Sequence, residues 1–151
     1  MNFRRGNESQ KHRRAKKLIA AKLAIHGYTT FPEHKLCDIA AIRRSHERVE
    51  ILCVEFETQS RTCTSNILRN FGNGAHRCIT VCDTTTVKAA VLKKFQRSLS
   101  AEILAKTTLM TFEEFLITFG ASCEAPISNE QSKRSQLTQQ NYDRCSSKQN
   151  Q

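Results

Sequence analysis

Two apolar segments that flank a four-residue polar turn constrain the fold of this chain more than any other feature. Residues 36–42 and 49–57 are rich in β-branched and apolar side chains, and Ser45-His46-Glu47-Arg48 lies between them. This pattern is typical of two antiparallel strands joined as a hairpin. If the hairpin is symmetric about His46 and Glu47, each residue pairs with the one equally far from the turn. Asp38 then lies opposite Glu55.

Three acidic residues occupy these strands, although acids are disfavoured there. Asp38 lies in the first segment, and Glu55 and Glu57 lie in the second. Cross-strand partners have Cβ atoms about 5 Å apart, and Glu57 follows Glu55 on the same face, roughly 7 Å further along. Carboxylates this close repel unless a proton or a cation lies between them. Because hard divalent ions prefer oxygen ligands, we expect a site for Mg²⁺ or Mn²⁺.

The rest of the chain has the pattern of alternating helices and strands. We expect helices over residues 7–26, 62–71, 84–99 and 112–119, and strands over residues 28–31, 77–82 and 106–110. Asn7 is the expected cap of the first helix, Ala15, Leu18, Ile19 and Leu23 form its apolar face, and Thr111 to Glu114 fit a capping box.

The connections predict how the strands pair. The strand that begins at Val49 reaches the strand at Arg77 through a helix, which requires a parallel, right-handed crossover. We therefore predict an α/β fold, with a mixed sheet flanked by helices, over residues 1–120. Residues 121–151 are rich in Ser, Gln and Asn and poor in apolar side chains. They predict a disordered polar tail.

The formal net charge of +10 favours a polyanionic partner, and nucleic acid first. Residues 1–25 hold eight Lys or Arg and one acid, Glu8. Glu8 falls on the same helix face as Ala15 and Ile19, which places a carboxylate beside the core face. The basic residues expected to contact the phosphate backbone of DNA are Lys11, Arg13, Arg14, Lys16 and Lys17. The alternative is a solvated basic helix face.

The cysteines indicate a reducing compartment. Of the seven, Cys37, Cys53, Cys78 and Cys82 lie in apolar strand-like segments, and the chain has no Cys-x-x-Cys pair. Because buried cysteine usually behaves as a small hydrophobe, we expect structural thiols in the cytoplasm rather than disulfides or a zinc site. With no run of 18 apolar residues, we expect no membrane span.

The order of elements and the acids resemble the restriction-endonuclease-like, or PD-(D/E)xK, nuclease superfamily over residues 6–119. The resemblance implies an αβββαβ core followed by αβα. Members of this group use such acids to hold Mg²⁺ for phosphodiester hydrolysis. By resemblance, Asp38, Glu55 and Glu57 are the catalytic residues, and Asp38 and Glu55 bind the metal together with Glu8. Glu57 stands where Lys is most frequent, which gives the Glu-x-Glu variant of some restriction enzymes.

A second stretch is similar to archaeal and mobile-element relatives of that superfamily. Residues 54–60 and then Asn66-Ile67 resemble their Val-Glu-x-Glu-Thr-Gly-Lys-Ser pattern. Gln59 and Ser60 stand in place of Gly and Lys, and Cys37 stands where Pro precedes the first acid.

The resemblance implies a metal-dependent, resolvase-like DNA endonuclease, with a homodimer as one arrangement because cutting two strands needs two sites. The departures from the pattern favour a second hypothesis, a catalytically inactive nucleic-acid-binding module on the same fold. A third hypothesis is an interaction protein that acts through its C-terminal tail.

Overall fold

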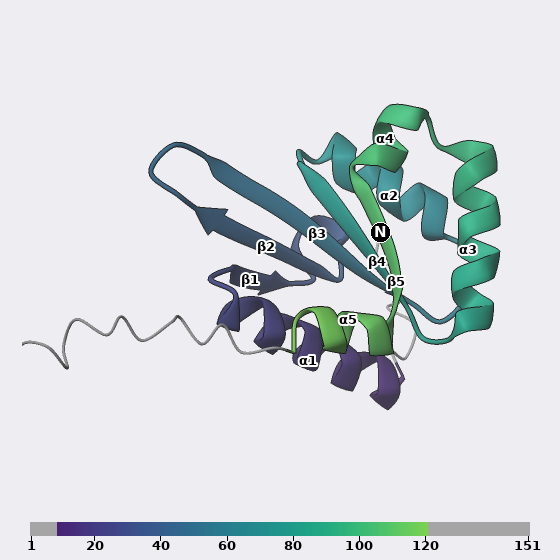
Figure 1. Ribbon diagram of the computed structural model, residues 1–151, viewed down its shortest axis with the longest axis horizontal. Helices are drawn as coiled ribbons and strands as arrows, with labels where there is room; N and C mark the ends of the chain where they lie inside the picture. The colour runs from purple at the N-terminus through teal and green to yellow at the C-terminus, as the bar shows by residue number, and fades with distance from the viewer. Residues whose placement is uncertain (1–8, 121–151) are drawn as a thin grey trace, which may run out of the picture.

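A five-stranded mixed sheet forms the centre of the protein (Figure 1). The structure, a computed structural model, describes residues 9–120 and, of Leu36, the backbone alone. The strands are β1 (Thr29–Pro32), β2 (Ile39–Arg44), β3 (Val49–Glu57), β4 (Arg77–Cys82) and β5 (Thr107–Thr111). They lie side by side in chain order. Strands β1 to β3 are antiparallel, and β3 to β5 are parallel.

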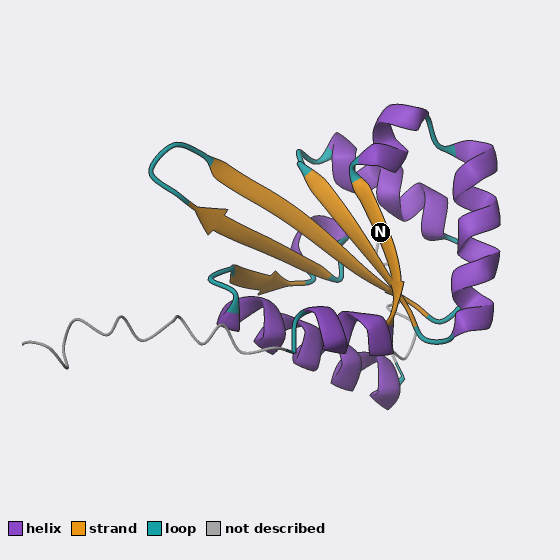
Figure 2. Cartoon of the chain, in the orientation of Figure 1, coloured by secondary structure: helices purple, strands orange, loops and turns teal. Residues whose placement is uncertain are grey.

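Helices cover both faces of the sheet (Figure 2). One face carries α1 (Gln10–Ile25) and α5 (Phe112–Thr118), whose Ile19, Leu23 and Phe115 pack on Val54 and Val81. The other carries α2 (Cys63–Gly72) and α3 (Thr85–Ser98). The predicted α/β class, with a mixed sheet flanked by helices, is therefore confirmed. Two short helices were not expected: η1 (His34–Leu36) and α4 (Ala101–Ala105).

The register of the β2–β3 hairpin agrees with the prediction from its symmetry. Ile39 pairs with Val54, and Arg44 pairs with Val49. No extra residue interrupts the ladder between these pairs, so the side chains keep their expected faces. Asp38 directly precedes β2 and lies at the same end of the hairpin as Glu55. Beyond that point β3 continues beside β4 alone, as far as the pair Glu57–Cys82.

The helix caps explain where the helices begin. Ser9 is the N-cap of α1, and its hydroxyl accepts a hydrogen bond from the His12 backbone at 3.1 Å, so the helix begins later than predicted. Asn7, Glu8 and residues 121–151 lie outside the described residues. Thr84 caps α3, and Thr111 and Glu114 form the predicted capping box of α5.

The buried side of α1 differs from the predicted stripe at two positions. Leu18 is exposed, whereas Lys16 is buried beside Ala15 and Ile19. The Lys16 ammonium lies 3.2 Å from the Glu33 carboxylate. This pair lets a lysine take part in the buried side of the helix, because a buried cation needs an anionic partner. Five cysteines are buried free thiols, including the four predicted ones: Cys37, Cys53, Cys63, Cys78 and Cys82.

Candidate active site

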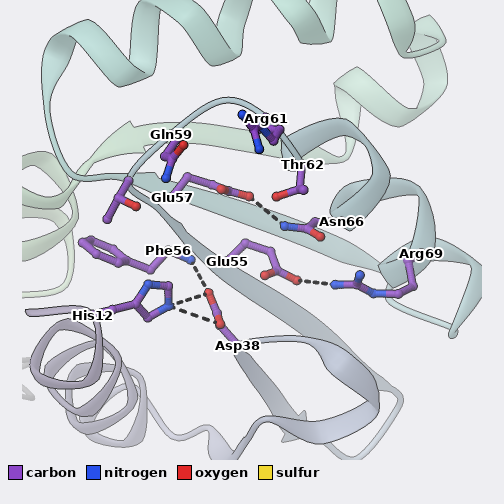
Figure 3. A pocket seen from close by; sticks show the side chains of 11 residues that line it. His12, Asp38, Glu55, Phe56, Glu57, Gln59, Arg61, Thr62, Asn66 and Arg69 are labelled. Atoms are coloured by element: carbon purple, nitrogen blue, oxygen red, sulfur yellow. Dashed lines mark hydrogen bonds and ion pairs between the residues drawn. The ribbon is translucent and has the colours of Figure 1, made fainter. Parts of the chain in front are cut away.

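The three acids predicted from the hairpin line one cavity at the end of β3 (Figure 3). The cavity has a volume of about 540 Å³. Asp38, Glu55 and Glu57 are joined there by His12 from α1, by Asn66 and Arg69 from α2, and by the loop that follows β3. The hairpin register thus brings together acids that are far apart in the sequence, and α1 and α2 close the cavity from the two faces of the sheet.

Glu55 is almost completely buried, with 4% of its surface exposed. Its carboxylate accepts a hydrogen bond from the Asn70 amide at 2.7 Å and lies 3.6 Å from the Arg69 guanidinium. Burial raises the pKa of Glu55 to about 8, and the neighbouring charge of Asp38 adds to this effect. The Asn70 hydrogen bond opposes the rise. The folded protein therefore favours the neutral form of this acid.

Glu57 is also buried, and it is held by Asn66, which lies one turn before Asn70 on the same face of α2. Its carboxylate accepts a hydrogen bond from the Asn66 amide at 2.8 Å. Burial raises the pKa of Glu57, against the effect of that hydrogen bond. Asn66 and Asn70 are four residues apart, so both amides point from one helix face towards the two glutamates. Sequence reasoning noted Asn66 only as part of a motif and missed Asn70.

Asp38 has different partners from the two glutamates. Its carboxylate accepts a hydrogen bond from the Phe56 backbone at 2.8 Å. The His12 ring nitrogen lies 3.3 Å and the Lys16 ammonium 3.8 Å from its oxygens. Two side chains of α1 thus accompany Asp38, whereas α2 supplies an amide to each glutamate and the Arg69 guanidinium to Glu55.

The loop that delivers Asp38 is tightly constrained. Glu33 and Lys35 have φ angles of 55° and 50°, in the left-handed region that L-residues seldom adopt. The Glu33 backbone donates a hydrogen bond to the Asp38 carbonyl at 2.9 Å, which closes the loop. Its side chain joins Lys16, so backbone and side chain together fix the approach of Asp38 to β3.

The structure gives His12 and Lys16 positions that the sequence analysis did not predict. His12 lines the cavity and packs edge-on against Phe56 with ring centroids 5.3 Å apart. Lys16, expected to contact DNA, has 9% of its surface exposed and faces Glu33 and Asp38. Of the other predicted DNA contacts, Lys11 pairs with Asp83 at 2.6 Å, and all four are exposed: Lys11, Arg13, Arg14 and Lys17.

The donor atoms in the cavity are of the kind that hard divalent cations prefer. Within residues 9–120, no group of three or more His, Cys, Asp or Glu side chains is arranged to hold a metal ion. Mg²⁺ needs fewer protein ligands, because it keeps several waters and binds through one or two carboxylates. Asp38 and Glu55 offer two such carboxylates. Burial is the main cause of the raised pKa of Glu55, and Asn70 and Arg69 offset only part of it.

The protein belongs to the α/β class, and it has a carboxylate-lined cavity at one end of its sheet. No family model, no curated protein and no solved structure matches it. None of the helices in the described part of the chain is long and apolar enough to cross a membrane.

Proposed function

We propose that this protein is a Mg²⁺- or Mn²⁺-dependent endonuclease that hydrolyses DNA phosphodiester bonds on a restriction-endonuclease-like fold. The observation that carries the proposal is the convergence of Asp38, Glu55 and Glu57 on one cavity. Two features support the proposal. The element order from α1 to β4 agrees with the αβββαβ core that the resemblance implies, and the formal net charge is +10.

Asp38 and Glu55 are the residues that would hold the ion. When bound, the ion polarises a phosphate oxygen and lowers the pKa of a water molecule. Glu57 lies two residues beyond Glu55 on the same side of β3 and accepts the proton of the attacking water. Its raised pKa suits this role, because a general base works best with a pKa near the operating pH. Asn66 holds its carboxylate in place.

The cavity also contains basic side chains. Arg61 and Arg69 both line it, and a guanidinium can donate two parallel hydrogen bonds to a phosphate group. They supply positive charge that Ser60, in the position where relatives carry Lys, does not. On α1, the exposed Arg13, Arg14 and Lys17 add charge for the DNA backbone.

One observation favours the second candidate, a catalytically inactive nucleic-acid-binding module. Every carboxylate of the cavity already has a protein donor within hydrogen-bonding distance: Phe56 for Asp38, Asn70 for Glu55, and Asn66 for Glu57. A relic of a metal site would keep such contacts without using the acids for chemistry.

The test is cleavage of supercoiled plasmid and of branched DNA with Mg²⁺, Mn²⁺ or EDTA. We expect metal-dependent nicking by the wild type and none by Glu55→Gln. Glu102→Gln, which removes an exposed acid on α4 outside both the cavity and the hairpin turn, serves as the matched control and should cleave normally. DNA binding without cleavage under any metal condition would replace the endonuclease by the binding module.

A further inference from the structure

A second cavity lies at the opposite end of the β2–β3 hairpin, beside its turn. It has a volume of about 590 Å³, similar to that of the cavity lined by Asp38, Glu55 and Glu57, which we call the acidic cavity. Arg43, Arg48 and Arg77 line it together with Glu50 and His76. We call it the arginine cleft. Figure 1 shows that the hairpin turn extends away from the helices.

Positive charge predominates in the arginine cleft. Glu50 is the single acid of its wall, and it lies 2.8 Å from Arg43 and 3.5 Å from Arg77. Three guanidinium groups against one carboxylate leave a formal charge of +2, counting His76 as neutral. Burial works against ionisation of Glu50, yet the Tyr28 and Arg43 hydrogen bonds keep its pKa below the usual range. Glu50 is therefore a fixed anion that orients two of the arginines.

An internal ion-pair network accounts for only part of this cluster. Arg43 and Arg77 are held by Glu50, and Arg43 also lies over the Tyr28 ring at 4.7 Å. Even so, their side chains are 50% and 56% exposed, so each guanidinium keeps donors available to solvent. Within residues 9–120, Arg48 forms no ion pair. Oriented, half-exposed guanidinium groups around a hollow suit phosphate oxygens.

His76 adds a polar donor to the same wall. Its Nδ1 accepts a hydrogen bond from the Ile51 backbone at 3.3 Å, which places the ring proton of the neutral form on Nε2. The cleft thus combines guanidinium groups with an imidazole N–H group, a mixture typical of sites that contact a sugar–phosphate backbone.

Strand β3 fixes the spacing between the two cavities. Seven residues separate Arg48 from Glu55, which corresponds to about 23 Å along an extended strand. Successive phosphates of one strand of duplex DNA advance about 3.4 Å along the helix axis, so the gap corresponds to about seven nucleotides along that axis. Helix α1 connects the same two places, because His12 lines the acidic cavity and Tyr28, just beyond its end, contacts Arg43. Its exposed Arg13, Arg14 and Lys17 lie within this span.

We propose that the arginine cleft binds the phosphate backbone of a nucleic acid about seven nucleotides from the phosphate held at the acidic cavity. The inference rests on the proposed function, and it extends the nucleic-acid contact from α1 to the hairpin turn. Arg48 makes a contact that serves the ligand alone, whereas Arg43 and Arg77 also stabilise the turn through Glu50.

The test is binding of a fluorescein-labelled 30-base-pair duplex, followed by anisotropy at several NaCl concentrations with EDTA present to prevent cleavage. The variants are Arg48→Gln and the double variant Arg48→Gln/Arg77→Gln. Arg97→Gln, which removes an exposed charge on α3, is the matched control. The slope of log affinity against log salt is negative, and each lost phosphate contact should reduce its magnitude by about 0.9. We therefore expect decreases of about 0.9 and about 1.8, and no change for the control.

The outcomes separate this inference from the proposed function. If the wild type binds the duplex and Arg48→Gln binds with the same affinity and slope, the cleft is not a contact, while the endonuclease proposal stands. An equal loss for Arg97→Gln would also overturn the inference, because it would reflect net charge alone. Failure of the wild type to bind DNA would overturn both proposals. Thermal unfolding midpoints of all variants exclude a folding defect as the cause.

Discussion

Replacement of Glu55 by Gln tests whether ionisation of this buried acid lowers the free energy of unfolding. Gln keeps the shape of the side chain and an oxygen that can accept the Asn70 hydrogen bond, but it removes the charge. The pKa of Glu55 is about 8 in the folded protein and 4.5 ordinarily. The folded chain therefore keeps a proton that the unfolded chain releases between these values. Its contribution to stability is complete below about pH 4.5 and is lost as the pH rises through about 8.

The magnitude follows from the same two pKa values. At about 1.4 kcal/mol per pH unit, their difference corresponds to about 5 kcal/mol of unfolding free energy. Relaxation of the cavity and entry of water reduce this value, because effective dielectric constants in proteins exceed those of a dry interior. We expect the wild type to lose about 2–4 kcal/mol relative to Glu55→Gln between pH 5 and pH 8.

The assay is urea unfolding followed by circular dichroism across this pH range, with EDTA present. Glu47→Gln, at an exposed position, should follow the wild type at every pH. Adding Mg²⁺ at pH 8 should stabilise the wild type, because the ion binds the folded site and not the unfolded chain. The same addition should leave Glu55→Gln nearly unchanged. If Glu55→Gln is the less stable protein at pH 8 in EDTA, Arg69 and Asn70 stabilise the charged form and the reasoning fails.

Three further measurements follow from the contacts. Asp38→Asn should lower the free energy of unfolding at pH 7 by about 1–3 kcal/mol in urea titrations, because it removes the charge that faces Lys16. Phe115→Ala should cost about 3–5 kcal/mol in the same assay, because it deletes a fully buried ring of the core. Burial raises the pKa of Cys82 to about 12, so at pH 8 its thiol should react with a disulfide reagent only after urea is added. Mass mapping of the labelled peptides measures this reaction.

The hairpin could be predicted in detail because local rules determine it. A short polar turn between two apolar segments leaves few registers, and burial of both sheet faces penalises a slip by one residue. Observed pairs such as Ile39–Val54 follow the predicted symmetry, and so Asp38 arrives at the end of β3 as expected. Caps at Thr84 and Thr111 were also predictable, because their hydrogen bonds reach only three residues along the chain.

The partners of the acids could not be predicted, because they depend on how helices pack on the sheet. Asn70 and Lys16 have ordinary helix positions in the sequence, and only the docking of α2 and α1 brings them to the acids. Leu18 shows the same limit in the opposite direction. Helical spacing assigned it to the core face, but in the structure Leu18 is exposed, and Lys16 is buried beside Glu33. A contact between residues far apart in the sequence has no local signature.

The three acids have different kinds of partner, and this difference argues against a purely structural role. His12 and Lys16 lie beside Asp38, and Lys16 can compensate its charge, but the hydrogen bonds to Glu55 and Glu57 come from the neutral amides of Asn70 and Asn66. An amide orients a carboxylate without neutralising it, and Arg69 offsets only part of the charge that burial opposes. Acids kept for stability are usually paired, and well-packed apolar side chains often stabilise a protein as much as buried ions do. Two oriented glutamates with raised pKa values reduce stability, which is the pattern of a site retained for binding or chemistry.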